Sequence, residues 1–384
     1  MRSNMRVIIL VPGLPVNLEK IRGGVHSAVA NLLRGFTALP EVQIRAIAFS
    51  REVEEEKTVK FAPNIEICYV PEGNFPYHSI NYLLHGPRIL KKHIKQFRPD
   101  IIHYEEGNTF MFTKLFGLKN TKYLLTIHGM SFDEAKRKKK IKDKITWYFN
   151  GLVAVYMTPG NIIHLSNFSK NKHANRKIVK QSIIPNAIVP AYFQVAQKGS
   201  TDNIWLYIGI IDNNKNLIFQ LEALKELVSR GKFYKLEVLG DFSNDAYKDL
   251  ILSYVKNNKL EDYIHFNGWV SQPEVLSHIA KADILVVSSK HESLPMVIAE
   301  SMAAGKVVVA STVGGIPEMV QDQVNGFLYD LSEPEKLVNI LSDLYNNNEK
   351  IKSISAKAKE TAIERYQCEN VARKTLAFYE QCLV

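Results

Sequence analysis

Short runs of β-branched and apolar residues alternate with longer amphipathic segments along the whole chain, and this alternation limits the fold more than any other feature. The runs are continuous, without the strict apolar–polar alternation of strands that have one face in water. Continuous runs are typical of parallel strands that helices cover on both faces. The runs occupy residues 6–11, 43–49, 65–70, 101–103, 123–127, 162–166, 204–208, 235–239, 264–266, 284–288, 307–311 and 326–329. The pattern predicts an α/β fold.

The same pattern divides the chain into two domains. It restarts near Trp205, after a polar stretch at residues 197–203 that is typical of a linker. We expect one Rossmann-like, doubly wound domain over residues 1–195 and a second over residues 196–367. Ligands of such sheets bind outside the carboxyl ends of the strands, so the cleft between the domains is the expected active site. Helices are predicted over residues 24–37, 216–230, 246–257, 273–281, 294–304 and 333–346.

The composition excludes several classes of protein. Hydrophobic residues make up 46% and charged residues 23% of the 384 residues, which rules out a collagen-like or broadly disordered chain. The three cysteines are scattered, so we expect neither a disulfide framework nor a zinc site. The first apolar run is too short for a signal peptide, and the apolar part of residues 145–169 is too short to span a bilayer. These features predict a cytoplasmic protein without a transmembrane helix.

Positive charge is concentrated in the first half of the chain. Residues 1–197 hold 29 Lys and Arg against 14 Asp and Glu, a net charge of +15, whereas residues 198–384 hold 20 against 25, a net charge of −5. This asymmetry predicts an anionic partner for the first domain. The basic run from Lys136 to Lys144 either lies on an anionic surface, such as the inner face of the cytoplasmic membrane, or is a solvated loop. No nucleic-acid-binding motif accompanies it, so no nucleic acid is expected.

The most informative stretch is residues 288–328, which reads SSKHESLPMVIAESMAAGKVVVASTVGGIPEMVQDQVNGFL. A strand leads into a loop that ends near Glu292, and the helix of residues 294–304 follows. Glu292 and Glu300 would bracket this helix, about 12 Å apart along its axis. The helix N-terminus offers free N–H groups and a positive dipole end to a diphosphate. The two carboxylates could hold hydroxyl groups at both ends of a nucleotide sugar, although a solvated amphipathic helix would show the same spacing.

This stretch resembles the donor-binding signature of the family 4 retaining glycosyltransferases, which have the GT-B fold. That signature has two Glu separated by seven residues, a small-residue helix end, a Val-rich strand and Gly-Gly-x-x-Glu. The positions that fit are Glu292, Glu300, Ala303, Ala304, Gly305, Val307, Val308, Val309, Gly314, Gly315 and Glu318, followed by Gly326, Phe327 and Leu328. The resemblance covers nearly the whole chain and is tighter after residue 200 than before it.

Weaker matches occur elsewhere in the chain. Gly23-Gly24 resembles the glycine-rich loop before the first helix, and His128-Gly129 resembles a strand-end pair that faces the donor sugar. Gly268-Trp269-Val270 resembles the segment that contacts the base, and Pro185-Asn186-Ala187 the inter-domain Pro-Asn-Gly. Residues 368–384 resemble a C-terminal helix that crosses back to the first domain.

The resemblance implies a retaining transfer of a sugar from a nucleotide sugar, with UDP favoured, to a glycan or lipid-linked acceptor. It also implies roles for individual residues: Glu292 orients the donor sugar and Glu300 holds the ribose hydroxyls. Lys215 and the helix N-terminus neutralise the diphosphate, and His128 contacts the sugar. No metal ion is required by this scheme, and the expected pathway is bacterial surface polysaccharide biosynthesis. The other implied binding residues are Gly24, Gly209, Gly268, Val270, Leu294, Pro295 and Met296.

One position departs from the family pattern. The family usually shows Gly-Arg-Leu-x-x-x-Lys after the first strand of the second domain, and here Ile210 takes the place of the Arg while Lys215 stays in register. Either Lys215 and the helix dipole suffice, or another base such as Lys290 replaces the Arg, or turnover is weak. Two other functions remain open at this point. The chain could be a GT-B enzyme of another reaction, such as a nucleotide-sugar epimerase or a phosphorylase, or a non-catalytic partner in a glycan-assembly complex.

Overall fold

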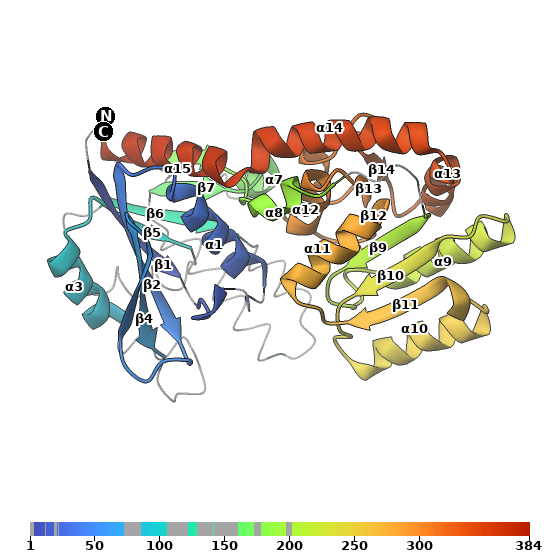
Figure 1. The fold of residues 1–384 in the computed structure, drawn as a ribbon, viewed down its shortest axis with the longest axis horizontal. Helices are drawn as coiled ribbons and strands as arrows, with labels where there is room; N and C mark the ends of the chain where they lie inside the picture. Colours follow the sequence, from blue (N-terminus) through green and yellow to red (C-terminus); the bar gives the residue numbers. More distant parts are fainter. Residues whose placement is uncertain are drawn as a thin grey trace. The chain divides into compact units, whose positions relative to one another are not determined.

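The protein consists of two compact α/β units. The computed structural model describes residues 4–11, 13–18, 21, 23–72, 86–105, 122–128, 141, 160–172, 178–196 and 202–384. One unit comprises Met1–Ala187 together with Cys368–Val384, and the other comprises Ile188–Gln367 (Figure 1). The division lies eight residues before the predicted boundary. Ile188 bridges to Gln367, and Tyr192 is buried in the core of the second unit, so this segment packs with the second sheet.

The first unit is built on an eight-stranded sheet with the order β3-β4-β2-β1-β5-β6-β7-β8. All neighbouring pairs are parallel except β3 and β4, so β3 is an antiparallel edge strand. The strands are β1 (Met5–Val11), β2 (Val42–Ser50), β3 (Lys57–Ala62), β4 (Ile65–Pro71), β5 (Ile101–Tyr104), β6 (Lys122–Ile127), β7 (Asn161–His164) and β8 (Lys180–Ile183). The chain reverses its direction of progress between β1 and β5, which makes their carboxyl ends the switch point of this sheet.

Helices cover both faces of the first sheet. On one face α1 packs with α15, the C-terminal helix, which therefore belongs to the first unit as expected. This contact is close: a Cβ on Gly35 would lie 2.1 Å from the carbonyl oxygen of Cys368. On the other face Leu90 of α3 packs against β1, β5 and β6. The helices are α1 (Gly24–Phe36), α3 (Gly86–Phe97), α7 (Asn167–Lys172) and α15 (Cys368–Leu383).

The second unit has a six-stranded, fully parallel sheet with the order β11-β10-β9-β12-β13-β14. Its strands are β9 (Ile204–Ile208), β10 (Lys235–Leu239), β11 (Ile264–Gly268), β12 (Ile284–Val287), β13 (Val307–Ser311) and β14 (Phe327–Tyr329). The first three strands run outward in one direction, and the chain then returns to place β12 beside β9. The switch point of this sheet therefore lies at the carboxyl ends of β9 and β12.

Two apolar layers sandwich the second sheet. Residues of α9, α10 and α13 form one layer and residues of α8, α11, α12 and α14 form the other (Figure 1). Both faces of β13 are buried, which explains its continuous apolar sequence. The helices are α8 (Pro190–Phe193), α9 (Leu217–Ser229), α10 (Asp245–Asn257), α11 (Gln272–Lys281), α12 (Met296–Ala303), α13 (Pro334–Leu344) and α14 (Asn348–Tyr366), and two 3₁₀ turns cover Glu261–Tyr263 and Ile316–Glu318.

The predicted α/β class is confirmed, but several elements were not predicted. The sequence pattern did not predict the strands β3 and β8 or the helices α3, α7, α8 and α14. The helix expected over residues 294–304 is shorter than predicted, because Pro295 has an extended backbone and caps a helix that begins at Met296. The three cysteines are free and buried. Within the described ranges, no helix is both long enough and apolar enough to cross a membrane.

Candidate active site

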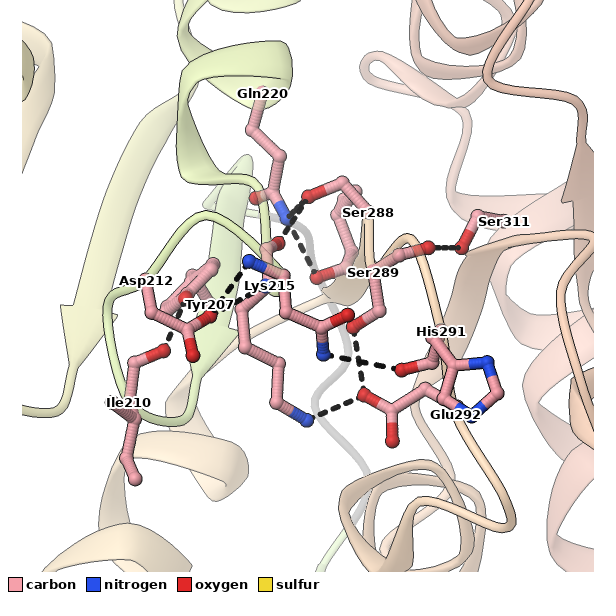
Figure 2. Close-up of polar contacts among 12 residues, drawn as sticks. Tyr207, Ile210, Asp212, Lys215, Gln220, Ser288, Ser289, His291, Glu292 and Ser311 are labelled. Carbon is pink, nitrogen blue, oxygen red and sulfur yellow. Dashed lines mark hydrogen bonds and ion pairs between the residues drawn. The ribbon is translucent and has the colours of Figure 1, made fainter. Parts of the chain in front are cut away.

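The predicted functional residues of the second unit gather at the switch point of its sheet. The loop that follows β9 carries Lys215, and the loop that follows β12 carries Glu292 (Figure 2). The carboxyl ends of adjacent parallel strands lie on one edge of a sheet, so loops distant in sequence meet there. A parallel α/β sheet binds its ligands at this place.

The β9 loop is a tight turn that fixes the backbone of Lys215. The Asp212 carboxylate accepts hydrogen bonds from the backbone N–H of Asn214 at 3.0 Å and of Lys215 at 2.8 Å. Such an Asx turn replaces backbone pairing that the loop would otherwise lack. Gly209 precedes the turn with a φ of 144°, and its carbonyl oxygen lies 2.0 Å from where a Cβ on Gly240 would stand. The strand ends are therefore too close for any side chain on Gly240.

Lys215 and Glu292 form an ion pair. The Lys215 Nζ lies 2.5 Å from Glu292 Oε1, and the Ser289 hydroxyl donates to the same oxygen at 2.8 Å (Figure 2). The side chains are 28% and 12% exposed, so a ligand can still reach both. A diphosphate carries more negative charge than one carboxylate and also accepts charge-assisted hydrogen bonds, so it can compete with Glu292 for Lys215.

A buried hydrogen-bond network holds this pair from behind. The Ser288 hydroxyl donates toward the carbonyl oxygens of Lys215 and Asn216, both at 3.0 Å, and accepts from Gln220 Nε2 at 2.9 Å (Figure 2). The Gln220 oxygen in turn accepts from Trp205 Nε1 at 2.9 Å, deep in the core. Buried polar groups that are satisfied in this way rigidify their surroundings. The network therefore ties the β9 loop to the end of β12.

Gly314 permits the close approach of a third loop. A Cβ at Gly314 would lie 1.7 Å from the Glu292 carbonyl oxygen, and its φ of +57° is left-handed. The next residue, Gly315, donates its N–H to the same oxygen at 3.4 Å. The predicted Gly-Gly turn thus has a physical reason, because only glycine combines this backbone conformation with this lack of space.

The predicted bracketing of α12 by two glutamates needs correction. Glu292 lies in the loop, four residues before the helix begins, and Glu300 lies within the helix. The 12 Å separation assumed eight helical residues and does not apply. Leu294 and Pro295 belong to the loop, and Met296 is the first helical residue. The leading N–H groups are therefore those of Met296 and Val297, because the N–H of Ile298 already donates to the carbonyl oxygen of Pro295 at 3.2 Å.

Glu300 occupies a less polar environment than Glu292. It is partly buried, and burial raises the pKa of its carboxyl to about 7. The hydroxyl of buried Tyr192 lies close enough that the Glu300 charge contributes, after burial, to raising the pKa of that phenol. A carboxylate that is costly to ionise gains most from ligand groups that donate hydrogen bonds to it.

The remaining predicted positions of the second unit lie on the same edge of the sheet. Gly268 ends β11 with a φ of +67°, and the next N–H, of Trp269, donates to Asp241 at 3.0 Å. Val270 follows directly and packs against the core from a partly buried position. Ile210, which replaces the usual Arg, is 61% exposed. Lys290 donates to the Asn213 side chain at 3.0 Å in the neighbouring loop.

A second group of polar residues lies at the carboxyl edge of the first sheet. His128 follows β6, and its Nε2 lies 2.7 Å from Oε2 of Glu105, which follows β5. Both side chains are buried, at 9% and 2% exposed. They line a cavity of about 20 Å³ together with Thr126 and His103. Gly24 begins α1 in this unit and is not among the residues that line the cavity.

Sequence reasoning identified His128 but missed Glu105. The signal was present: a carboxylate directly follows the buried strand that pairs with the strand before His128. The predicted membrane-binding run from Lys136 to Lys144 lies outside the described residues, apart from Ile141, which is 75% exposed. No group of three or more His, Cys, Asp or Glu within the part of the chain that the structure describes is arranged to hold a metal ion.

The fold matches that of known glycosyltransferases. Anabaena HepE, solved in complex with UDP, superposes with a TM-score of 0.73 at 17% identity over 98% of this chain and 100% of that chain. Two Rossmann-like units with a C-terminal helix that returns to the first unit define the GT-B fold, as predicted.

Comparison of sequences places the chain within a family. The model of the glycosyl transferases group 1 matches residues 189–361, and the model of glycosyltransferase family 4 matches residues 22–192. The two matches together span residues 22–361, and the chain belongs to the glycosyltransferase family that these two models describe. It is 26% identical to an uncharacterized glycosyltransferase of Methanocaldococcus jannaschii, over 94% of this chain and 95% of that protein. It is also 32% identical to the lipopolysaccharide 1,2-N-acetylglucosaminetransferase of Salmonella typhimurium, over 44% of this chain and 46% of that protein.

Proposed function

We propose that this glycosyltransferase transfers a sugar, a hexosyl or N-acetylhexosaminyl group, from a UDP-sugar to a glycan or lipid-linked acceptor, with retention of anomeric configuration. The observation that carries the proposal is the Lys215–Glu292 pair at the switch point, beside the start of α12. A cation, a carboxylate and a set of free helix N–H groups are the elements that a sugar diphosphate requires. The UDP in the HepE structure supports the choice of base, and the Salmonella relative supports the choice of acceptor.

The proposed roles follow from the contacts in the second unit. The diphosphate takes Lys215 from Glu292, and the freed carboxylate accepts hydrogen bonds from hydroxyls of the donor sugar. Glu300 accepts the ribose hydroxyls, which favours its ionised form in the complex. The backbone at Gly209, Gly268 and Val270 lines the same edge and leaves room for the nucleotide. In the first unit, His128 contacts the sugar.

The proposed reaction is a front-face substitution. The acceptor oxygen forms a bond to the anomeric carbon while the bond from that carbon to the diphosphate oxygen breaks. The bonding electron pair goes to the diphosphate, which also takes the proton of the acceptor hydroxyl. Lys215 and the N-terminus of α12 stabilise the charge that develops on the leaving group, and this scheme requires no metal ion. We place the reaction in the assembly of a bacterial surface polysaccharide, on the cytoplasmic side of the membrane.

A thermal-shift panel with UDP, GDP, ADP and dTDP tests the nucleotide assignment. Ligand at about 100 times its dissociation constant stabilises a protein by about 2.7 kcal/mol, enough to shift the melting temperature by several degrees. We expect a shift with UDP that Glu300→Ala abolishes and that Glu364→Ala, an exposed change on α14, leaves intact. No shift with any nucleotide would favour a non-catalytic role instead.

A further inference from the structure

The inference concerns five hydrogen-bonded side chains in the first unit and rests on the proposed function. They are Glu105, His128, Thr126, His103 and Tyr379. We propose that Glu105 is a positioning residue for glycosyl transfer. It holds the His128 ring with the proton on Nε2, so that Nδ1 is the atom that accepts a hydrogen bond from a sugar hydroxyl. Glu105 itself touches no substrate in this proposal and acts only through His128.

The contacts of Glu105 fix the direction of its hydrogen bonds. Burial by itself would raise the pKa of this carboxyl, but the hydrogen bonds that it accepts from His128 and Thr126 lower the pKa and favour the ionised form. An ionised carboxylate is a pure acceptor. His128 must therefore donate its Nε2–H across the 2.7 Å contact, and the Thr126 hydroxyl must donate as well.

The ionised Glu105 also determines the hydrogen-bond directions of Thr126, His103 and Tyr379. The Tyr379 hydroxyl lies 2.7 Å from Nδ1 of His103, and Nε2 of His103 lies 2.6 Å from the Thr126 hydroxyl oxygen. Since Thr126 gives its only proton to Glu105, its oxygen accepts from His103 Nε2–H, and His103 Nδ1 accepts from Tyr379. Burial lowers the pKa of His103, which keeps this ring neutral. From Tyr379 of α15 through His103 and Thr126 to Glu105, each residue thus donates a hydrogen bond to the next.

One polar atom of these five side chains has no partner. Nδ1 of His128 is buried and has no hydrogen-bond partner among the described residues. A buried polar atom without a partner costs about 1–3 kcal/mol in a folded protein, so Nδ1 is stabilised when a water molecule or a ligand group donates a hydrogen bond to it. The cavity that His128 lines has room for one hydroxyl-sized group. A sugar hydroxyl can fill it and donate to Nδ1.

Glu105→Gln is the informative variant because an amide has only one acceptor oxygen. When Thr126 occupies that oxygen, the NH₂ group faces His128 and donates to Nε2, which moves the ring proton to Nδ1. Selective ¹⁵N labelling of histidine reports the position of this proton in the full chain at alkaline pH, with His128→Gln used to assign the signal. We expect Nε2–H in the wild type and Nδ1–H in Glu105→Gln. An unchanged tautomer would overturn the proposal.

Kinetics test whether the tautomer matters for the reaction. The readout is UDP release from UDP-glucose and from UDP-N-acetylglucosamine, alongside the affinity for UDP measured by calorimetry. We expect Glu105→Gln to lower turnover about tenfold to a hundredfold, the size of a lost hydrogen bond to a charged or polarised group, with the UDP affinity unchanged within about twofold. The double variant Glu105→Gln/His128→Gln should be no slower than His128→Gln alone. Additive losses would show that Glu105 acts independently of His128.

Two controls keep the outcomes distinct. Glu66→Gln removes a carboxylate that pairs with Arg45 in the same sheet and should leave both the His128 tautomer and turnover unchanged. Glu105→Asp keeps the charge but shortens the reach to His128, and serves if Glu105→Gln does not fold. Failure of the wild type to bind UDP would overturn the proposed function, while the tautomer measurement still decides the role of Glu105.

Discussion

The two units use the same place in the sheet in different ways. In the second unit, the strand-end pair of Lys215 and Glu292 is partly exposed, and each partner can be exchanged for a ligand group. In the first unit, the strand-end pair of His128 and Glu105 is buried, and a chain of hydrogen bonds that reaches Tyr379 of α15 backs it. The first arrangement suits a site that must change partners, and the second suits a side chain that must keep one orientation.

The glycine turns of the two units show the same contrast. Gly23 precedes α1 with a φ of +96°, and a Cβ there would meet no atom within 4 Å. Gly314 has a left-handed φ as well, but a Cβ there would overlap the Glu292 carbonyl. The turn of the first unit therefore needs glycine for its conformation alone, whereas the turn of the second unit needs it for conformation and space. The second site is the more tightly assembled of the two in its backbone, although its charged side chains are more exposed.

The largest expected effect tests the Lys215–Glu292 pair, whose partners a ligand can replace. Lys215→Ala should lower turnover about 10²- to 10³-fold, because it removes a charge that stabilises the leaving diphosphate. Steady-state kinetics with a UDP-sugar donor measure this loss. Lys290→Ala, which removes an exposed neighbouring cation, is the matched control and should cost little. A loss of equal size in Lys290→Ala would assign the diphosphate to both cations, and a loss in Lys290→Ala alone would assign it to Lys290.

The next effect compares the two glycine turns. Gly314→Ala should destabilise the second unit by about 3 kcal/mol or more, because the new Cβ forces the Glu292 backbone away. Gly23→Ala should cost only about 1 kcal/mol, the price of a strained φ. Chemical denaturation followed by fluorescence measures both. Equal costs at the two positions would show that the Glu292 loop yields easily and would weaken the contrast between the turns.

A smaller effect concerns the pH dependence of stability. The pKa of Glu300 is about 7 in the folded protein and near its ordinary 4.5 when unfolded, so the folded state binds the extra proton between these values. The free energy of unfolding should therefore fall as the pH rises from 4.5 to 7 and stay level above 7. We expect a loss of about 1–2 kcal/mol, reduced from the full shift because the side chain is only partly buried.

Two variants assign that pH dependence. Glu300→Gln should lack the loss, and Glu364→Gln, on the exposed side of α14, should retain it. Denaturation series at pH 5 and pH 8 provide the comparison. If the wild type and Glu300→Gln lose stability in parallel, another group is responsible.

The sequence predicted the strands of the second unit better than those of the first for a physical reason. Strands β9, β12 and β13 are short, covered on both faces and almost wholly apolar, so their limits are visible as runs of residues. Strand β3 is an edge strand with exposed lysines, and β8 reads Lys-Gln-Ser-Ile, so neither shows such a run. Pattern alone finds strands where both faces are buried and misses them where one face meets water.

The same limit applies to the candidate sites. Lys215 and Glu292 stand in motifs with fixed spacing, but their pairing across 77 residues depends on β12 returning beside β9. Glu105 belongs to no motif, and only the pairing of β5 with β6 brings it to His128. The start of α12 at Met296 depends on the extended backbone of Pro295, which proline permits but does not require. The sequence thus indicates which side chains have a role, whereas the contacts that determine the role are known only from the fold.

The smallest expected effect concerns Ile210, an exposed apolar residue in the β9 loop that also carries Lys215. Its side chain leaves the β9 loop with one cation fewer than the family pattern has. Ile210→Arg should tighten UDP binding about tenfold, or about 1.4 kcal/mol, because a guanidinium adds charge-assisted hydrogen bonds to a phosphate. Calorimetry measures the change, and Leu250→Arg, at a half-exposed position on α10, controls for added charge alone. If affinity rises equally in both variants, general charge drives binding. If neither changes, Lys215 and the N-terminus of α12 already saturate the diphosphate, and Ile210 has replaced the Arg without loss.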